Sequence, residues 1–542
     1  MSRVEPSVRF ERLMPDRAPP AGAFPEALRS GTGAACGFLP AIPQDDGAWR
    51  RAVDDAVAAT APVPLDLAET LAARQRALGA GARAEEAALD LARPGTVVVV
   101  AGQQPGLLGG LLLAFHKAAG AVNLAGRLDG QAGLRVVPAF WLASEDHDLD
   151  EANRAVLLDR GGRPRRLRLD RTPDGRSLMD LPLERAELEV LRDEVAAILP
   201  DTDRARSVLE LLDAEEGDDL ATWCARVFAR LLGDAGLVVL EPPALLPYAG
   251  EVQAELLEQA TPIAEGLRTA GRALEKAKLP APLDVPEGYV PLFVRDEVGG
   301  ARRRVRLDAS GRAHVDGRAE PLDIQVLAAH LRAHPELGSG DVVGRVFVQH
   351  RLLPVLAGFG GPTELAYHAQ VRAAHAAVGL RYPLALPRPE ATWVDARSER
   401  TAEAFGTTIG DLLAEGVAGP PPTADTPIDA DLDDWRTRIL EVPAHLAARG
   451  GEVDRALDRA RKRLGDTFTK VEKDLRGAAA RDAGVGADRW KRLEGLLRPR
   501  GRPQERGLSA LSVVARQGTT LFRAGLAGLD PLAPGHHVLH AG

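Results

Sequence analysis

The chain has 542 residues, of which 45% are hydrophobic, and this length can bury several cores in about three or four structural units. Its 68 Lys and Arg residues are outnumbered by 77 Asp and Glu residues, so the net charge of -9 provides no basic field to attract nucleic acid or an anionic membrane. The two cysteines, Cys36 and Cys224, lie far apart, which argues against a disulfide framework and a thiolate zinc site. Without a secretory signal or an apolar run of membrane-spanning length, we expect a cytoplasmic protein.

A strand, a turn, a helix and a second strand are predicted between residues 96 and 143. Helical spacing of apolar residues over 46–91 precedes this unit. The run Thr96–Ala101 is typical of a strand buried on both faces, residues 111–128 have helical periodicity, and 135–143 repeat the strand signal. Such a unit closes into a parallel sheet, and ligands bind beyond the carboxyl ends of its strands. We therefore expect the glycine-rich turn at 102–110 and the acidic segment at 144–151 to share one edge.

The remaining chain is predicted to complete this sheet and to add inserted segments. A core strand is expected at 236–241, a β-hairpin at 290–296 and 302–308, and a return to the core at 345–349 and 353–359, followed by the loop 360–364. The expected divisions are 1–152 for the first part of the Rossmann-like core, 153–220 for a first connecting insertion, 221–250 for a core strand and helix, 251–338 for a second insertion, 339–395 for the last part of the core, and 396–542 for a linker and a coiled-coil domain.

The C-terminal region combines a predicted linker at 416–427 with a coiled-coil-like helix. Apolar positions recur at steps of three and four residues. They are Val453, Leu457, Ala460, Leu464, Thr467, Val471 and Leu475. A break at Gly484–Gly486 and a second helix through Trp490 and Leu497 are expected to follow. The pattern fits self-association, and it equally fits a helix packed on its own core.

The turn holding Gly102, Gln103, Gln104 and Gly106 is the first candidate binding element. Backbone N–H groups and the positive end of the next helix converge there, which suits a phosphate or a carboxylate. The turn matches neither standard nucleotide fingerprint. The two glutamine amides both donate and accept hydrogen bonds, as the orientation of a sugar hydroxyl or an amino-acid carboxylate requires. The alternative is a tight turn that only packs the strand against the helix.

Glu145, Asp146, His147 and Asp148 are the second candidate, at the end of a predicted strand. Crowded carboxylates raise one another's pKa, so one of them, or His147, is suited to act as a general base toward a substrate ammonium group. A metal site is an alternative, but the regular spacing of zinc ligands is missing. The third interpretation is an acidic turn that caps the next helix.

Other polar residues give weaker signals. Lys117, next to His116 on the first helix, is placed either to reach a phosphate or to face solvent. Glu364 and His368 are four residues apart on one helical face, which favours an ordinary helix pair over a metal site. The histidines at 536, 537 and 540 are interpreted as part of a terminus, and the two cysteines as structural thiols. No metal is predicted.

Together these motifs resemble the cysteine-adding enzyme family of bacillithiol synthesis. Gly102–Leu107 matches the family's Gly-Gln-Gln-x-Gly-Leu turn, and His116-Lys117 its following His-Lys pair. The segment from Phe140-Trp141 through Glu145–Asp148 matches the signature Phe-Trp-x-x-x-Glu-Asp-His-Asp. The later matches are Gln349, Gly360-Gly361-Pro362, Glu364, Tyr367 and Arg388. This chain departs from the family pattern at Leu111, where proline is usual, and at Thr363, where glycine is usual.

The resemblance implies an α/β fold with a Rossmann-like core like that of class I aminoacyl-tRNA synthetases, two connecting insertions and a C-terminal coiled coil that pairs subunits into a homodimer. It implies an amide-forming ligase that joins cysteine to glucosaminyl-malate. We expect ATP or another nucleotide to activate the carboxyl group, through either an adenylate or an acyl phosphate. The expected catalytic residues are Glu145, His147 and Asp148. The expected binding residues are Gly102, Gln103, Gln104, Gly106, His116, Lys117, Asp146, Gln349, Gly361, Glu364, Tyr367 and Arg388.

Two other classes of function fit parts of the sequence. A metal-dependent hydrolase or deacetylase of an amino sugar would use Asp146, His147 and Asp148 as ligands. A non-catalytic sensor would bind a ligand in the α/β core and a partner through the coiled coil. Small molecules are the expected ligands in all three cases, and neither nucleic acid nor a membrane is expected as a partner.

Overall fold

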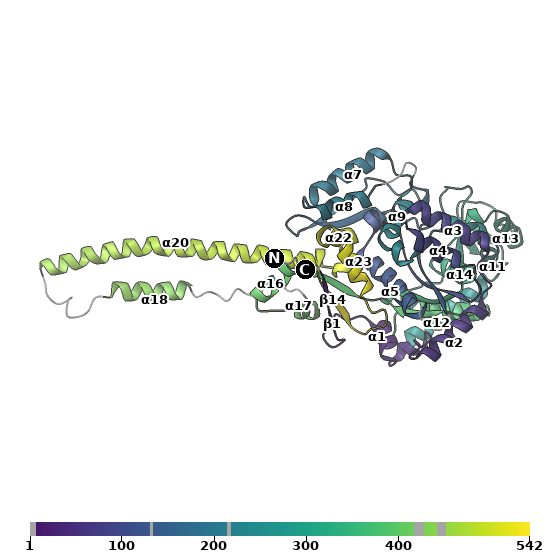
Figure 1. Cartoon of the computed structure of the whole chain (residues 1–542), viewed down its shortest axis with the longest axis horizontal. Coiled ribbons are helices and arrows are strands. Elements are labelled where there is room, and N and C mark those ends of the chain that lie inside the picture. Colours follow the sequence, from purple (N-terminus) through teal and green to yellow (C-terminus); the bar gives the residue numbers. More distant parts are fainter. Residues whose placement is uncertain (1–6, 130–133, 214–217, 417–427, 442–450, 542) are drawn as a thin grey trace.

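The structure is a computed structural model that describes residues 7–129, 134–213, 218–416, 428–441 and 451–541. Figure 1 shows a globular part that holds the sheets, and the long helix α20 (Glu452–Leu497) that extends away from it. Helix α18 (Ile428–Leu440) lies beside α20 (Figure 1). Among the described residues, no helix is both long and apolar enough to cross a membrane.

A parallel sheet forms the core of the globular part. Within the described chain it has five strands in the order β12-β11-β2-β3-β6. Their bounds are β2 (Thr96–Gln103), β3 (Arg135–Leu142), β6 (Val238–Leu240), β11 (Val355–Gly360) and β12 (Leu384–Pro387). Val97 and Val99 of β2 belong to one hydrophobic cluster, whereas Val98 and Val100 belong to the other. The α/β class, the Rossmann-like core and the strand buried on both faces are confirmed.

Helices cover both faces of this sheet. One hydrophobic cluster contains residues of α2 (Asp46–Ala59), α5 (Leu112–Asp129), α9 (Leu220–Leu232), α22 (Ala510–Gln517) and α23 (Thr519–Ala527). The other contains residues of α3 (Leu65–Leu78), α11 (Gly250–Glu258), α12 (Ala260–Lys276), α13 (Ile324–Ala333), α14 (Val342–Leu352) and α15 (Pro362–Ala377). Helix α4 (Ala82–Asp90) contributes one residue to each cluster, and α1 (Ala23–Ser30) packs with α15 in a third cluster.

Smaller sheets interrupt the core. After the short helix α6 (Leu149–Ala152), a hairpin of β4 (Arg154–Leu158) and β5 (Pro164–Arg168) precedes α7 (Arg185–Ile198) and α8 (Asp203–Leu211). Helix α10 (Pro242–Leu245) follows β6. A second sheet, in the order β10-β7-β8-β9, consists of β7 (Tyr289–Val294), β8 (Arg303–Leu307), β9 (Ala313–Val315) and β10 (Gly338–Gly340). The predicted hairpin is confirmed by the antiparallel pairing of β7 with β8.

The sequence pattern predicts that the core sheet resumes at residues 345–349, and this prediction is wrong. They lie inside helix α14, whose N-terminus is capped by Asp341 through the backbone N–H groups of Val343 and Gly344. A short apolar run cannot by itself distinguish a buried strand from a buried helix, and here the cap at Asp341 favours the helix. The core strand is β11, which begins at Val355.

The histidines near the C-terminus, interpreted from the sequence as part of a terminus, lie in a buried strand. They lie in β14 (His536–Ala541), which pairs antiparallel with β1 (Val8–Leu13) and parallel with β13 (Ala391–Asp395). His536, His537 and His540 are all buried. Strand pairing in this third sheet thus joins β1, near the N-terminus, to β14, near the C-terminus.

The C-terminal helix also differs from its prediction. Helix α20 continues through Gly484–Gly486 to Leu497, so the expected break and second helix are not formed. Helix α18 packs against it, with the rings of Trp435 and Phe468 5.1 Å apart. Helices α16 (Ala396–Ala404) and α17 (Ile409–Glu415) lie at its base, and α21 (Gln504–Gly507) follows it. The predicted linker from 417 to 427 lies outside the described residues.

Candidate functional site

A cavity of about 800 Å³ opens at the carboxyl ends of the central strands. It contains twelve of the fifteen residues predicted for the site. They are Gly102, Gln103, Gln104, Lys117, Glu145, Asp146, His147, Gln349, Gly361, Glu364, Tyr367 and Arg388. Gly106, His116 and Asp148 do not line it. The right-handed parallel sheet brings the loops after β2, β3 and β11 to this one edge, as the strand pattern predicted.

Lys117 joins the first loop to the third. Its ammonium group, on a side chain that is 1% exposed, donates to Gly102 O at 3.0 Å, Gln103 Oε1 at 2.8 Å and Glu364 Oε1 at 2.7 Å. Burial lowers the pKa of Lys117, although the Glu364 carboxylate opposes this shift. The pKa of Glu364 lies below its usual value because Lys117 and the Gly361 N–H outweigh the effect of burial. The lysine therefore faces the cavity wall and not solvent, and its charge is balanced.

Gln103 and Gln104 present different groups to the cavity. Gln103 Oε1 accepts from Lys117, so its amide N–H groups remain as donors. Gln104 Nε2 donates to Asp146 Oδ2 at 2.5 Å, so its carbonyl oxygen remains as an acceptor. Adjacent residues thus offer a donor suited to a carboxylate and an acceptor suited to an ammonium or a hydroxyl group.

The carboxylates after β3 have separate roles. Asp146 accepts hydrogen bonds from Gln104 and from the backbone N–H groups of His147 and Asp148, and these bonds lower its pKa despite burial. Glu145 is 6% exposed, and within the described chain its carboxylate accepts no hydrogen bond. Burial raises the pKa of Glu145, while the nearby Arg302 and Arg345 oppose part of that rise. Of these two carboxylates, Glu145 is therefore the one whose oxygen atoms remain available to a ligand.

Asp148 has a structural role. It is the N-cap of α6, where its carboxylate accepts from the Glu151 backbone N–H at 2.9 Å. Its side chain is exposed and lies outside the cavity, because the chain turns into the helix at this residue. The capping alternative therefore describes Asp148, whereas Glu145 and Asp146 belong to the cavity.

The sheet formed by β10, β7, β8 and β9 and its connecting loops supply one wall of the cavity. Arg302 lies over the Phe293 ring at 4.2 Å, donates to Ser339 Oγ and Gly340 O, and lies 3.3 Å from His147 Nδ1. These contacts fix the guanidinium near Glu145. They also engage His147, which is half exposed and whose imidazole helps to orient Arg302.

Helices α14 and α15 supply a wall of neutral imidazole and phenol groups. His375 Nδ1 lies 3.0 Å from the Val371 carbonyl, which can only accept, so His375 Nε2 accepts from His350 Nδ1 at 3.1 Å. Burial holds the pKa of His350 well below its usual value and lowers the pKa of His368 to about 4. His368 contacts the Tyr382 hydroxyl. Both histidines are thus uncharged near neutral pH and offer hydrogen bonds without charge.

The glycine-rich turn is only partly available to a ligand. The Leu112 N–H, at the start of α5, donates to the Leu508 carbonyl at 2.9 Å, and Ser509 Oγ donates to the Leu108 carbonyl. The C-terminal segment therefore covers this helix start, which the sequence interpretation had left open for an anion. Gly106 packs against Gly110, whose Cα lies 2.7 Å from the position that a Cβ on Gly106 would take. Its role is close packing of the turn.

His116 supports the site from behind. The Trp393 indole N–H donates to His116 Nε2 at 3.4 Å, and an indole can only donate, so Nδ1 carries the proton and donates to Glu505 at 3.0 Å. Burial lowers the pKa of His116, in agreement with a neutral ring. Glu505 also binds Arg388 Nη1 at 2.7 Å. His116 thus positions Glu505 and, through it, the cavity residue Arg388.

The sequence interpretation missed most of the arginines that line the cavity. Arg302 lies between β7 and β8, Arg345 lies in α14, and Arg502 and Arg506 come from the segment after α20. The only local signal was the cluster of arginines at 498, 500, 502 and 506, interrupted by prolines. Its placement beside the core depends on packing between distant parts of the chain.

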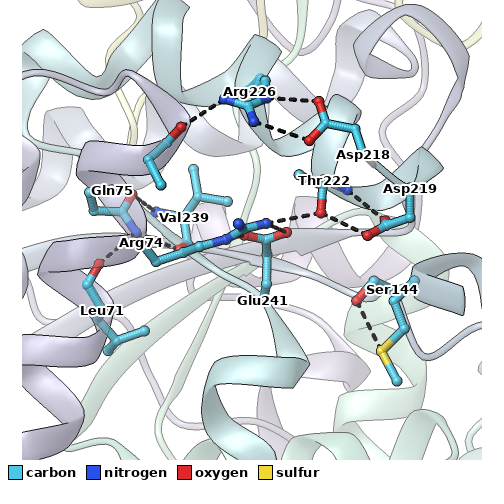
Figure 2. Close-up of polar contacts among 12 residues, drawn as sticks. Leu71, Arg74, Gln75, Ser144, Asp218, Asp219, Thr222, Arg226, Val239 and Glu241 are labelled. Carbon is cyan, nitrogen blue, oxygen red and sulfur yellow. Dashed lines mark hydrogen bonds and ion pairs between the residues drawn. The ribbon is translucent and has the colours of Figure 1, made fainter. Parts of the chain in front are cut away.

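A second group of buried charges lies outside the cavity, around β6. Figure 2 shows Arg74 bonded to Glu241 and Thr222, with Thr222 bonded in turn to Asp219. Arg226 and Asp218, also drawn there, form a buried pair with bonds of 2.9 and 3.0 Å. These groups join α3, α9 and the end of β6 and do not line the cavity.

Among the described residues, neither the cysteines nor a cluster of metal-binding side chains forms a second reactive site. Cys224 is buried, and burial raises the pKa of its thiol to about 12. Within the described residues, no group of three or more His, Cys, Asp or Glu side chains is arranged to hold a metal ion.

Comparison with known families gives the identity of the core. Residues 37–389 match the model of the N-terminal Rossmann-like domain of the bacillithiol biosynthesis protein BshC. The chain belongs to the BshC family. Proteins named "Putative cysteine ligase BshC" are 31% identical in Solibacter usitatus, over 80% of this chain and 82% of the relative, and 31% identical in Koribacter versatilis, over 82% and 84%. The relative from Oceanobacillus iheyensis is 25% identical over 79% and 81%. Membership of the BshC family makes this chain an enzyme of the ligase class, as its motifs predicted.

Proposed function

We propose that this enzyme forms the amide bond between the carboxyl group of cysteine and the amine of glucosaminyl-malate. The observation that carries the proposal is Glu145, a buried carboxylate without a hydrogen-bond partner among the described residues, in a cavity of about 800 Å³ at the edge where such sheets bind ligands. The names of the relatives support cysteine as one substrate. The amino-sugar malate follows from the bacillithiol assignment of the matching family.

Glu145 is the proposed general base. The acceptor amine is an ammonium ion near neutral pH and must lose a proton before its nitrogen can attack the cysteine carbonyl carbon. Burial raises the pKa of Glu145 toward the operating pH, which is the range in which a general base is most effective. Asp146 is less suitable, because three hydrogen bonds stabilise its ionised form. The proton moves to a Glu145 oxygen as the carbon–nitrogen bond forms and the activated oxygen leaves with its electron pair.

The neighbouring glutamines and charges are proposed to orient the substrates. The free amide N–H groups of Gln103 suit the carboxyl group of cysteine, and the free carbonyl of Gln104 suits an ammonium or sugar hydroxyl group. Arg302 and Arg345 lie near Glu145 and stabilise the negative charge that develops on the attacked carbonyl. The uncharged wall of His350 and His368 leaves this charge pattern unchanged near neutral pH.

A nucleotide is the proposed source of energy. ATP, when bound, supplies a phosphoryl or adenylyl group that turns a carboxylate oxygen into a leaving group. The size of the cavity and its lining of arginines suit a nucleotide beside the two other substrates. Residues Lys117 and Glu364 hold the loops after β2 and β11 together across this space.

Self-association through α20 is part of the proposal. Val453, Leu464 and Leu475, from the predicted apolar stripe, are 42%, 48% and 38% exposed. An exposed stripe of this spacing is typical of a coiled-coil seam. Light scattering should show a dimer that Leu464→Glu converts to a monomer. The matched variant Lys462→Glu, at an exposed position on the same helix, should leave the dimer intact, and a monomeric wild type would refute this part.

The product assay tests the proposed reaction. Purified protein is incubated with cysteine, glucosaminyl-malate and ATP, and the products are followed by mass spectrometry with each reagent omitted in turn. We expect the amide product and a nucleotide cleavage product only in the complete mixture. Loss of the proposed function would show as no product from folded protein that binds both substrates. Cleavage of an amino sugar that requires an added metal would favour the hydrolase instead.

A further inference from the structure

We propose that Arg388, Arg502 and Arg506 form a subsite for an oxyanion of a substrate, either a carboxylate or a phosphate. This inference deepens the proposed function and rests on it for the identity of the ligand. Two of the three residues lie in the segment after α20, beyond the residues 37–389 that match the Rossmann-like domain. The C-terminal part of the chain would thus complete the binding site of the core.

Arg388 presents a donor that has no partner. Its side chain is 2% exposed and lines the cavity. The Nη1 group donates to Glu505 and to the Pro389 carbonyl, and Nη2 contacts the other Glu505 oxygen. The Nε–H group is buried without a hydrogen bond. A buried donor left unsatisfied costs free energy, and an acceptor on a ligand would remove this cost.

Arg506 converges on the same place. A Cβ atom built on Gly361 would lie 3.6 Å from Arg388 Nε and 3.7 Å from Arg506 Nη2. The two guanidinium groups therefore share a point above Gly361, and the lack of a side chain there keeps it open. An oxygen atom slightly closer to both nitrogens would accept from both, in the manner in which arginines bind carboxylates and phosphates.

Arg502 extends this surface along the same segment. Its guanidinium and that of Arg506 line the cavity, and neither makes an ion pair or a hydrogen bond to another side chain within the described chain. Two unengaged cations at one cavity, four residues apart, are suited to a ligand group that carries more than one negative charge.

The nearby carboxylates leave this surface positive. Glu364, whose oxygen is 3.3 Å from the same point above Gly361, is balanced by Lys117 at 2.6 Å. Glu505 balances Arg388. Two carboxylates remain nearby. Glu390 faces Arg388, Arg29 and Arg506, and Glu151 faces Arg502. Burial raises the pKa of both carboxyl groups. With Glu505 paired to Arg388, the three cations Arg29, Arg502 and Arg506 outnumber these two carboxylates.

The segment that carries the arginines is fixed to the core. Gln504 bonds to both backbone groups of Trp393, and Glu505 bonds to His116 and Arg388. Gly507 packs against Pro499, where a Cβ would lie 2.5 Å from the proline ring. Arg502 and Arg506 therefore extend from an ordered backbone, which lowers the entropy cost of binding an anion.

Binding of two probes tests the subsite without turnover. L-malate alone and ADP alone are titrated by calorimetry into wild type, into the double variant Arg502→Gln, Arg506→Gln, and into Arg500→Gln. Arg500 is the matched control, because it is an exposed arginine on the same turn that does not line the cavity. We expect the double variant to lose at least tenfold in affinity for one probe, while Arg500→Gln binds like wild type.

The probe that is weakened identifies the ligand. Loss of malate binding would assign the subsite to the acceptor's carboxylates, and loss of ADP binding would assign it to nucleotide phosphates. Unchanged binding of both probes in the double variant would overturn the subsite, as would an equal loss in Arg500→Gln. If the double variant loses binding of a probe but the wild type makes no amide, the proposed function is refuted and the subsite stands.

Discussion

The two sets of buried charges in this protein differ in whether their hydrogen-bonding groups are satisfied within the described chain. Around β6, Arg226 pairs with Asp218, Arg74 pairs with Glu241, and Asp219 bonds to Thr222 (Figure 2). In the cavity, Glu145 has no hydrogen bond among the described residues, and Arg388 keeps a buried donor without a partner. Both sets lie near the carboxyl ends of the same sheet.

This difference separates structure from function by physical cost. A paired and bonded buried charge offsets its own desolvation, so the network around β6 needs no ligand. A buried donor or carboxylate without a partner costs free energy in the empty protein, and a bound substrate can repay that cost. A buried polar group that lacks a hydrogen bond is thus a better guide to the site than buried charge alone.

The largest effect is expected from opening the closed network. Arg226→Met leaves the Asp218 carboxylate buried without its guanidinium partner, which should lower the free energy of unfolding by about 3–5 kcal/mol. Urea denaturation measures this loss. The kcat/KM per folded molecule should stay near that of wild type, and a loss of activity with unchanged stability would place Arg226 in the functional set.

Lys117 should affect both stability and activity, because it bonds to both β2 and α15. Lys117→Met leaves Gly102 O, Gln103 Oε1 and the Glu364 carboxylate without their donor and should cost about 1–3 kcal/mol of unfolding free energy. The pKa of Glu364 should rise, since its cation is removed. Denaturation and turnover measured together check this, and a change in neither would remove Lys117 from the account.

The pH dependence of catalysis should report on Glu145. A general base works in its ionised form, so kcat/KM should fall as the pH falls through the pKa of Glu145, which burial places above that of an ordinary glutamate. Arg302→Gln removes a cation that lowers this pKa, so the acid limb of the profile should move to higher pH. A limb that stays in place or moves to lower pH would show that another group is the base.

The smallest effect is expected where charges are paired but exposed. Arg332 bonds to Glu251 and Glu258 at the surface, and Arg332→Gln should change the free energy of unfolding by about 0–1 kcal/mol. Thermal or urea denaturation would detect a larger change. A loss as great as that of Arg226→Met would mean that the number of bonds, and not burial, decides the cost.

The sequence predicted the part of the fold that local patterns control. Local runs of residues were enough to predict β2, the turn after it, helix α5 and β3. The parallel sheet that these elements form then places Gln103, Glu145 and Glu364 at one edge. The type of structure at 345–349 could not be predicted, because a short apolar run fits a strand or a helix.

The missed features depend on contacts between distant residues. His540 is buried because β14 pairs with β1, about 530 residues away. Arg502 and Arg506 reach the cavity because α21 packs on β13 and α5. No local pattern contains these contacts, so the arginines of the site could be found only in the folded chain.

Glu145→Gln tests the central claim most directly. The kcat/KM for glucosaminyl-malate is measured with cysteine and ATP saturating, beside Asp150→Asn, an exposed carboxylate of the same segment that does not line the cavity. Glu145→Gln should lose about 10²–10⁴-fold in kcat/KM, as expected for removal of a general base, with an unfolding midpoint no lower than that of wild type. Asp150→Asn should keep full activity. Activity within threefold of wild type in Glu145→Gln would contradict the account.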